Sequence, residues 1–218
     1  MSEMNTPRRP IKARDTLWAA QVAAWLARVG VRPNTISIAS ALFAGGAGLC
    51  LVSTRETTGD FQPWLLLIAA GLLQVRLLCN LFDGMVAIEG GFKTKSGEIF
   101  NELPDRFADA FIFVGAGYAT GGPGWAPAVG WLCAVLAVLT AYVRALGASA
   151  GAAQHFCGPM AKQHRMAVMT FACLASAVLT WWGAQWPVVG WALVLIATGS
   201  VITVFRRVAR VVRELEAK

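Results

Sequence analysis

Charged residues are scarce in this chain of 218 residues. They make up 14% of it, whereas 56% of the residues are hydrophobic, and a soluble domain carries about one-quarter charged residues. The five cysteines form no C-x-x-C pair, which leaves no pattern typical of a zinc or redox site. This composition argues against a soluble domain, and the nine tryptophans with many glycines and alanines are typical of a helical membrane protein.

Acidic residues are the rarest charged type, and their positions are uneven. Between Phe61 and Arg213 there are only six, and all fall within 27 positions: Asp83, Glu89, Glu98, Glu102, Asp105 and Asp109. An acid inside a membrane helix costs about 2.5–3.5 kcal/mol on insertion scales. A cluster of acids beside long apolar runs therefore predicts a bound divalent cation.

Long apolar segments account for most of the chain. Each is close to the ~20 residues that a helix needs to cross the hydrocarbon core. They lie at about 35–54, 63–88, 98–120, 125–148, 164–183 and 186–207. We therefore predict an all-α integral membrane protein with about six transmembrane helices.

The N-terminal part has a different pattern. Residues 12–29 place tryptophan, leucine and valine at helical spacing between basic residues, which predicts an amphipathic helix lying in the membrane interface. A soluble helix packed on the rest of the chain is the alternative. The expected organisation is a basic N-terminus with a juxtamembrane helix at 1–32, a transmembrane catalytic domain at 33–207 and a basic tail at 208–218.

The net charge of +7 comes from basic residues at the chain ends and in two loops. In a soluble protein such a charge indicates nucleic acid, but here the positive-inside rule and anionic headgroups explain it. We predict no nucleic acid partner. Both termini and the acidic segment are expected on the cytoplasmic side of a bacterial-type membrane.

Two helices are expected to present oxygen ligands to each other. Asn80 and Asp83 lie three residues apart, and Asn101, Asp105 and Asp109 recur every four residues, so each set shares one helix face. Oxygen ligands with several carboxylates suit Mg²⁺, Mn²⁺ or Ca²⁺ and not zinc.

Small residues follow the first acid of this segment. Gly84 and Ala87 leave the backbone open to a flat ligand, and the glycine-rich loop 89–96 with Lys93 can approach an anion. A second basic group comprises Arg144, Lys162 and Arg165. These three side chains either hold a phosphate of a substrate or only set the topology.

The segment from residue 80 to residue 105 resembles the signature of the CDP-alcohol phosphotransferase family, D-x2-D-G-x2-A-R-x8-G-x3-D-x3-D, without a gap. The matching positions are Asp83, Gly84, Ala87, Gly97 and Asp105, and the departures are Asn80, Ile88 and Asn101. The PNTIS segment at 33–37 and the G-x-x-x-K-x-x-R pattern at 158–165 are also similar to that family.

The resemblance implies transfer of a phosphatidyl-type group from a CDP-linked lipid, such as CDP-diacylglycerol, to an alcohol, with release of CMP in phospholipid biosynthesis. It implies one or two Mg²⁺ or Mn²⁺ ions on the signature acids and amides (Asn80, Asp83, Asn101, Asp105). Asp105 would be the base, and Gly84, Ala87 and Gly97 would line the cytidine together with Asn80 and Lys93. The family is usually homodimeric, and the basic group would favour a phosphorylated acceptor similar to glycerol 3-phosphate.

The departures leave alternatives open. Two asparagines remove two negative charges, and Asp109, one turn after Asp105, is a candidate metal ligand and catalytic residue that could restore one of them. A shifted alignment with Asp105 and Asp109 as the working pair is also possible. A membrane transporter or cation pathway and a catalytically silent relative that binds a CDP-linked lipid are the rival functions.

Overall fold

The computed structural model describes residues 16–57, 59–92, 96–119, 122–184 and 186–218. Within these ranges the chain forms seven helices and no strand. They are α1 (Leu17–Arg28), α2 (Pro33–Ser53), α3 (Phe61–Glu89), α4 (Gly97–Gly117), α5 (Ala126–Ser149), α6 (Lys162–Trp181) and α7 (Val188–Glu216). The predicted all-α fold is confirmed, and α2 to α7 coincide within a few residues with the six apolar segments, except that α7 continues to Glu216.

Four helices are long and apolar enough to cross a membrane by length and composition, namely α2, α3, α5 and α7. Helices α4 and α6 contain the charged residues described below, which lower their apolar character. The prediction of about six transmembrane helices therefore remains a prediction for these two.

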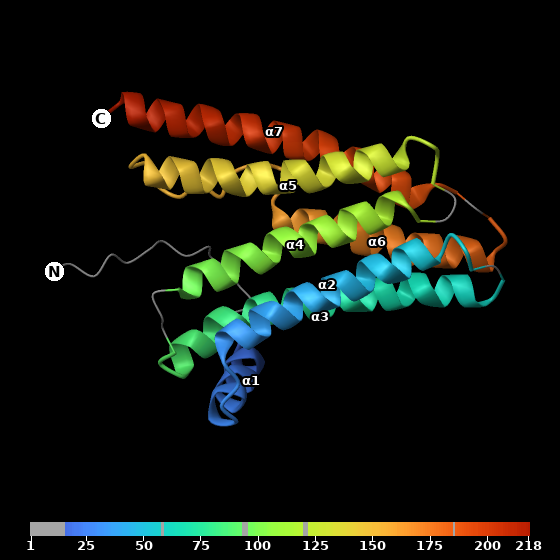
Figure 1. Ribbon diagram of the computed structural model, residues 1–218, viewed down its shortest axis with the longest axis horizontal. Coiled ribbons are helices and arrows are strands. Elements are labelled where there is room, and N and C mark those ends of the chain that lie inside the picture. The colour runs from blue at the N-terminus through green and yellow to red at the C-terminus, as the bar shows by residue number, and fades with distance from the viewer. Residues whose placement is uncertain (1–15, 58, 93–95, 120–121, 185) are drawn as a thin grey trace.

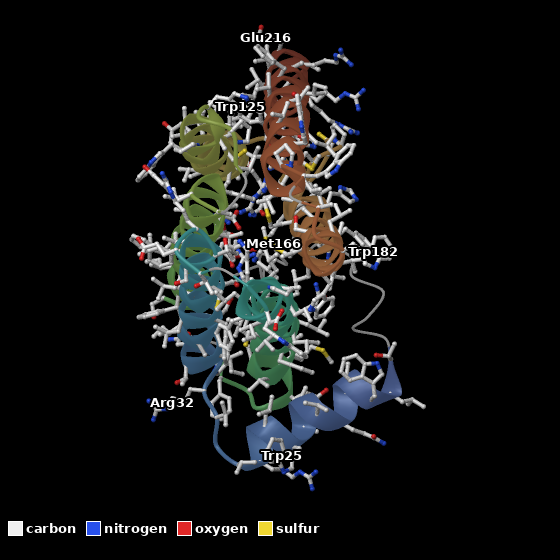
Figure 2. The ribbon with its side chains drawn as sticks, turned by 90° about the vertical axis from the view of Figure 1, so that its right-hand side faces the viewer. Trp25, Arg32, Trp125, Met166, Trp182 and Glu216 are labelled. Atoms are coloured by element: carbon white, nitrogen blue, oxygen red, sulfur yellow. The ribbon has the colours of Figure 1, made fainter. Side chains whose placement is uncertain are left out.

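The long helices form a bundle in which α4 lies centrally, with α2 and α3 on one side and α5 and α7 on the other (Figure 1). Helix α6 packs against α3 and α7. Helix α1 packs on α3 and lies crosswise to the bundle at its end, with Trp25 on its outer side (Figures 1 and 2). The helix predicted within residues 12–29 is thus confirmed from Leu17, and its position in the membrane interface stays a prediction.

Glycines set the close approach of α4 to its neighbours. A Cβ atom on Gly115 would lie 2.6 Å from the carbonyl oxygen of Gly48 in α2, and one on Gly130 of α5 would lie 2.5 Å from the carbonyl oxygen of Phe113 in α4. Small residues allow helix backbones to approach closely in membranes. The backbone of α4, which carries Asp105 and Asp109, is therefore held tightly between α2 and α5.

The outer surface of the bundle is largely apolar, as expected for contact with lipid. Tryptophans gather at the end of the bundle opposite α1, with edge-to-face pairs between Trp64 and Trp181 (5.8 Å) and between Trp125 and Trp191 (5.5 Å). Aromatic belts of this kind are typical of membrane–water interfaces. Trp182 at this end is also exposed (Figure 2).

Candidate active site

The first part of the site is built where α2 packs on α3. Asp83 is only 5% exposed, and its Oδ2 atom accepts a hydrogen bond from the Ser37 hydroxyl at 2.9 Å. One turn later on α2 and one turn earlier on α3, the Ser40 hydroxyl donates to Oδ1 of Asn80 at 3.4 Å. Since both pairs are three residues apart, two adjacent helix faces meet with their polar groups aligned. The Nδ2 atom of Asn80 is buried without a hydrogen-bond partner in the described part of the chain.

The second part of the site comes from α4. Asp105 is 8% exposed, and the ammonium group of Lys162, the first residue of α6, contacts its Oδ2 atom. The guanidinium groups of Arg76 and Arg106 lie 3.7 and 3.8 Å from its oxygens. Arg76 therefore links α3, the helix that carries Asp83, to the buried Asp105 of α4.

One turn further into the bundle, Asp109 is fully buried and paired with two arginines. Its Oδ1 atom lies 2.6 Å from Arg76 of α3, and its Oδ2 atom lies 2.9 Å from Arg165 of α6. Arg76 is itself fully buried and also contacts the sulfur of Met166, which lies in the middle of the bundle (Figure 2). Buried charges need partners of opposite sign, and this cluster ties α3, α4 and α6 together.

A further ion pair lies beside this region. Arg144 of α5 lies 2.6 Å from a carboxylate oxygen of Glu102 and donates to Gln154 at 3.0 Å. Its guanidinium also lies over the ring of Phe156, 5.2 Å from the ring centre. Helix α5 and the loop that follows it are thus connected to the start of α4.

Sequence comparison gives distant relatives over most of the chain, and no family model matches it. The inner membrane protein YnbA of Escherichia coli is 26% identical over 172 residues, which cover 79% of this chain and 81% of that protein. The phosphatidylinositol phosphate synthase of Mycobacteroides abscessus is 25% identical over 198 residues, which cover 85% of this chain and 80% of that enzyme.

Two crystal structures of Mycobacterium tuberculosis phosphatidylinositol phosphate synthase have the same fold. The structure with CDP-DAG bound aligns with a TM-score of 0.69 at 21% identity, over 88% of this chain and 92% of that one. The structure with manganese and citrate aligns with a TM-score of 0.70 at 22% identity, over 88% of each chain. The predicted resemblance to the CDP-alcohol phosphotransferase family is confirmed.

Several residues of the CDP-alcohol phosphotransferase signature are gathered by this fold and others are not. Asp83 and Asn80 lie where α3 packs on α2, and Arg76 of α3 links this helix to Asp105 of α4. Gly84 and Ala87 are half-buried just after Asp83. Asn101 is exposed, one turn before Asp105, and Gly97 begins α4. Lys93 lies outside the described residues.

The donor set that results fits a divalent cation only in part. In the described ranges, no group of three or more histidine, cysteine, aspartate or glutamate side chains is placed to hold a metal ion. Asp109, the candidate third carboxylate, has both oxygens engaged by arginines. The available set is therefore two carboxylates with asparagine oxygens, all of which are hard donors that suit Mg²⁺ or Mn²⁺.

The predicted phosphate-binding residues all pair with acids in this structure. Arg144 pairs with Glu102, Lys162 with Asp105 and Arg165 with Asp109. Counting Arg76 and Arg106, the region combines five basic side chains with four acidic ones, Asp83 included. This charge balance favours an anionic ligand.

Two features of the site were not predicted from the sequence. They are the contacts of the α2 serines with Asp83 and Asn80 and the pairing of Glu102 with Arg144. Ser37 lies in the PNTIS segment, which marked the family resemblance without a chemical role. Its position in the first turns of α2 could have indicated this role, because α2 precedes α3, the helix that carries Asp83. No local sequence pattern indicates the pairing of Glu102 with Arg144, because 42 positions separate them in the sequence.

Proposed function

We propose that this protein transfers a phosphatidyl-type group from a CDP-linked lipid, such as CDP-diacylglycerol, to an alcohol, releasing CMP in phospholipid biosynthesis. The observation that carries the proposal is that Asp83 and Asp105 are both buried at signature spacing, with Arg76 linking the helices that carry them. Similarity to phosphatidylinositol phosphate synthase, solved with CDP-DAG bound, supports the donor class.

A divalent cation fits the donor residues of this region. Asp83, Asp105 and Asn80 would hold it, with Asn101 at the exposed edge, and two carboxylates balance the charge of about one Mg²⁺ or Mn²⁺. The Nδ2 atom of Asn80 has no hydrogen-bond partner in the described part of the chain. Turning the amide would place its oxygen at this position, where it could bind the cation, and this supports the role. When bound, the ion offsets the negative charge of the donor diphosphate. A related structure contains manganese.

Small residues beside the carboxylates leave room for the nucleotide. We place the cytidine against Gly84, Ala87 and Gly97, and Lys93 is a further candidate for the CDP moiety. The site lies between helices that exclude water, which disfavours hydrolysis of the donor.

Asp105 is the candidate general base. The oxygen of the acceptor hydroxyl attacks the phosphorus of the phosphatidyl group, its proton passes to Asp105, and the bond from that phosphorus to the CMP oxygen breaks. A carboxylate within reach of the hydroxyl can act in this way. Asp109 is better suited to hold Arg76 and Arg165 in place, because both its oxygens are already bonded.

The basic side chains around the carboxylates favour an acceptor that carries a phosphate, such as glycerol 3-phosphate. Lys162, Arg144 and Arg165 converge on this region from α5 and α6, and guanidinium groups bind phosphate oxygens well. Lys162 and Arg144 would each exchange a carboxylate partner for a phosphate oxygen when the acceptor binds, whereas Arg165 would add its charge while it stays paired with Asp109.

We further propose a homodimer with both termini and the active site on the cytoplasmic side of the membrane. The basic residues near the ends of α5, α6 and α7 support this orientation by the positive-inside rule. The tryptophans at the opposite end fit the other interface.

The test is an assay of the purified protein with labelled CDP-diacylglycerol, candidate alcohols and either Mg²⁺ or Mn²⁺. We expect metal-dependent release of CMP that Asp83→Asn and Asp105→Asn each reduce by at least a hundredfold. Glu56→Gln, an exposed acid at the other end of the bundle, is the matched control and should leave the rate unchanged. Absence of metal-dependent CMP release from the folded protein with every alcohol would overturn the proposal.

A further inference from the structure

Helix α7 is longer than a span of the hydrocarbon core requires. Its 29 residues correspond to about 43 Å at 1.5 Å per residue, which matches a whole bilayer with headgroups, about 40–45 Å. The core alone takes about 20 residues, so the helix from Arg206 onward reaches the headgroup level. Figure 1 shows this end of α7 projecting past the start of α2.

Three arginines form an exposed stripe on this extension. Arg206, Arg210 and Arg213 are separated by four and three residues and therefore share one face of the helix. All three are exposed. No hydrogen bond or ion pair engages any of them in the described part of the chain, so their charge is available to a ligand.

An apolar stripe lies about a third of a turn further round the exposed side of the helix. Phe205, Val208 and Val212 are spaced by three and four residues, and all are exposed, Phe205 to 70%. This stripe continues the exposed surface of Val201, on the part of α7 that is apolar enough to contact lipid chains. The exposed side of the extension therefore suits a ligand that has both an acyl chain and a negatively charged group.

The face of α7 next to the arginines, on the side away from the apolar stripe, is fixed to the protein. Thr203, Arg207 and Glu214 form hydrogen bonds of 2.9–3.0 Å with the backbone of loop 150–161, which leads into α6. These bonds prevent α7 from rotating about its axis. The arginine stripe is therefore held at the edge of the exposed side of the helix, next to loop 150–161.

From this geometry we propose that Arg206, Arg210 and Arg213 form a binding surface for the phosphate groups of anionic lipids in the adjacent leaflet. Their spacing along the helix, about 10 Å, places them through the depth of the headgroup layer. The proposal does not depend on the transferase function. Each basic residue near an anionic membrane surface contributes roughly fivefold in affinity, and the contribution decreases with added salt.

Native mass spectrometry of the purified chain, released from detergent micelles and titrated with phosphatidylglycerol or phosphatidylcholine, tests this surface. We expect the first phosphatidylglycerol to bind at least tenfold more tightly than phosphatidylcholine. The variant R206Q/R210Q/R213Q should lose at least tenfold in phosphatidylglycerol affinity and keep its phosphatidylcholine affinity. The side chains are exposed and unpaired, so the variant should fold, which thermal unfolding checks.

Two controls make the result specific. R206K/R210K/R213K keeps the charge and should retain most of the preference, whereas R55Q, at the opposite end of the bundle, should not change it. Equal binding of the two lipids by the unmodified chain overturns the proposal. So does an unchanged phosphatidylglycerol affinity in the glutamine variant, which would place anionic lipids on other basic residues.

Discussion

The ammonium group of Lys162, at the first position of α6, lies against the Oδ2 atom of Asp105 in α4. The last aspartate of the signature segment is therefore neutralised by a side chain 57 positions away in the sequence. Two asparagines replace aspartates elsewhere in that segment, so the local charge is less negative than in the family pattern. Lys162 occupies a position from which its charge can act on a metal or on a transferred phosphate.

Lys162→Met should separate metal binding from catalysis. Removing a positive charge a few ångströms from the carboxylates should raise the affinity for Mn²⁺ by roughly tenfold. The rate of CMP release should fall about a hundredfold, because a cation that binds the phosphate of the acceptor is lost. Titration of free Mn²⁺ by electron paramagnetic resonance and the transfer assay measure the two effects. Lys162→Arg is the control, and unchanged Mn²⁺ affinity in Lys162→Met would show that the lysine does not adjoin the metal.

Ser37→Ala should weaken the site through Asp83. The variant loses a hydrogen bond of 2.9 Å to the Oδ2 atom of Asp83, and hydrogen bonds to charged groups contribute about 1.5–3 kcal/mol. We expect CMP release to fall about ten- to a hundredfold, with little change in thermal unfolding. Ser53→Ala, at an exposed position near the end of the same helix, should have no effect. Equal activity of the two variants would mean that Ser37 does not position Asp83.

The helices and the acidic segment could be predicted from the sequence because both depend on local patterns. Apolar runs of about 20 residues and acids at three- and four-residue spacing identify helices and helix faces directly. Asp83 and Asp105 lie on two different helices, α3 and α4, as these patterns predict. The alternation of arginine and valine from residue 206 predicts that the last helix extends past its apolar span, and the continuation of α7 to Glu216 confirms this helix.

The partners of the charged residues could not be predicted in the same way. Arg76, Arg165 and Asp109 come from three helices, and their pairing depends on how the helices are rotated and how closely they pack. A repeat of Asp105 and Asp109 one turn apart indicates only a shared helix face. It does not show that one of the two carboxylates contacts arginines and the other a lysine.

Asp109→Asn should destabilise the protein more than Asp105→Asn. It leaves Arg76 and Arg165 buried with no full negative charge at Asp109, and breaking a buried ion pair from one side costs about 3–5 kcal/mol. We expect a marked fall in the thermal unfolding temperature of the solubilised protein. Asp60→Asn, an exposed position, is the matched control. A variant that folds as stably as the original but no longer binds Mn²⁺ would instead identify Asp109 as a metal ligand.

Glu214→Gln should loosen the loop that leads into α6. The backbone N–H of Ala153, and then the ring of His155 and the ammonium of Lys218, lower the pKa of Glu214 below its ordinary value. Glu214 lies beyond the hydrocarbon core, because the core takes only about 20 residues of a helix that begins at Val188. A carboxylate with a lowered pKa stabilises the folded arrangement above the ordinary glutamate pKa of about 4.3. This contribution is lost as the pH falls through the lower folded value.

Hydrogen exchange of loop 150–157 measures this effect. At pH 7 the loop of the original protein should exchange more slowly than that of Glu214→Gln. The difference should disappear as the pH falls through the lowered pKa of Glu214. Glu216→Gln, two residues further along and exposed, should match the original protein at every pH. If Glu214→Gln exchanges at the original rate at pH 7, the loop is held by Thr203 and Arg207 alone, and the C-terminal turns of α7 do not control its position.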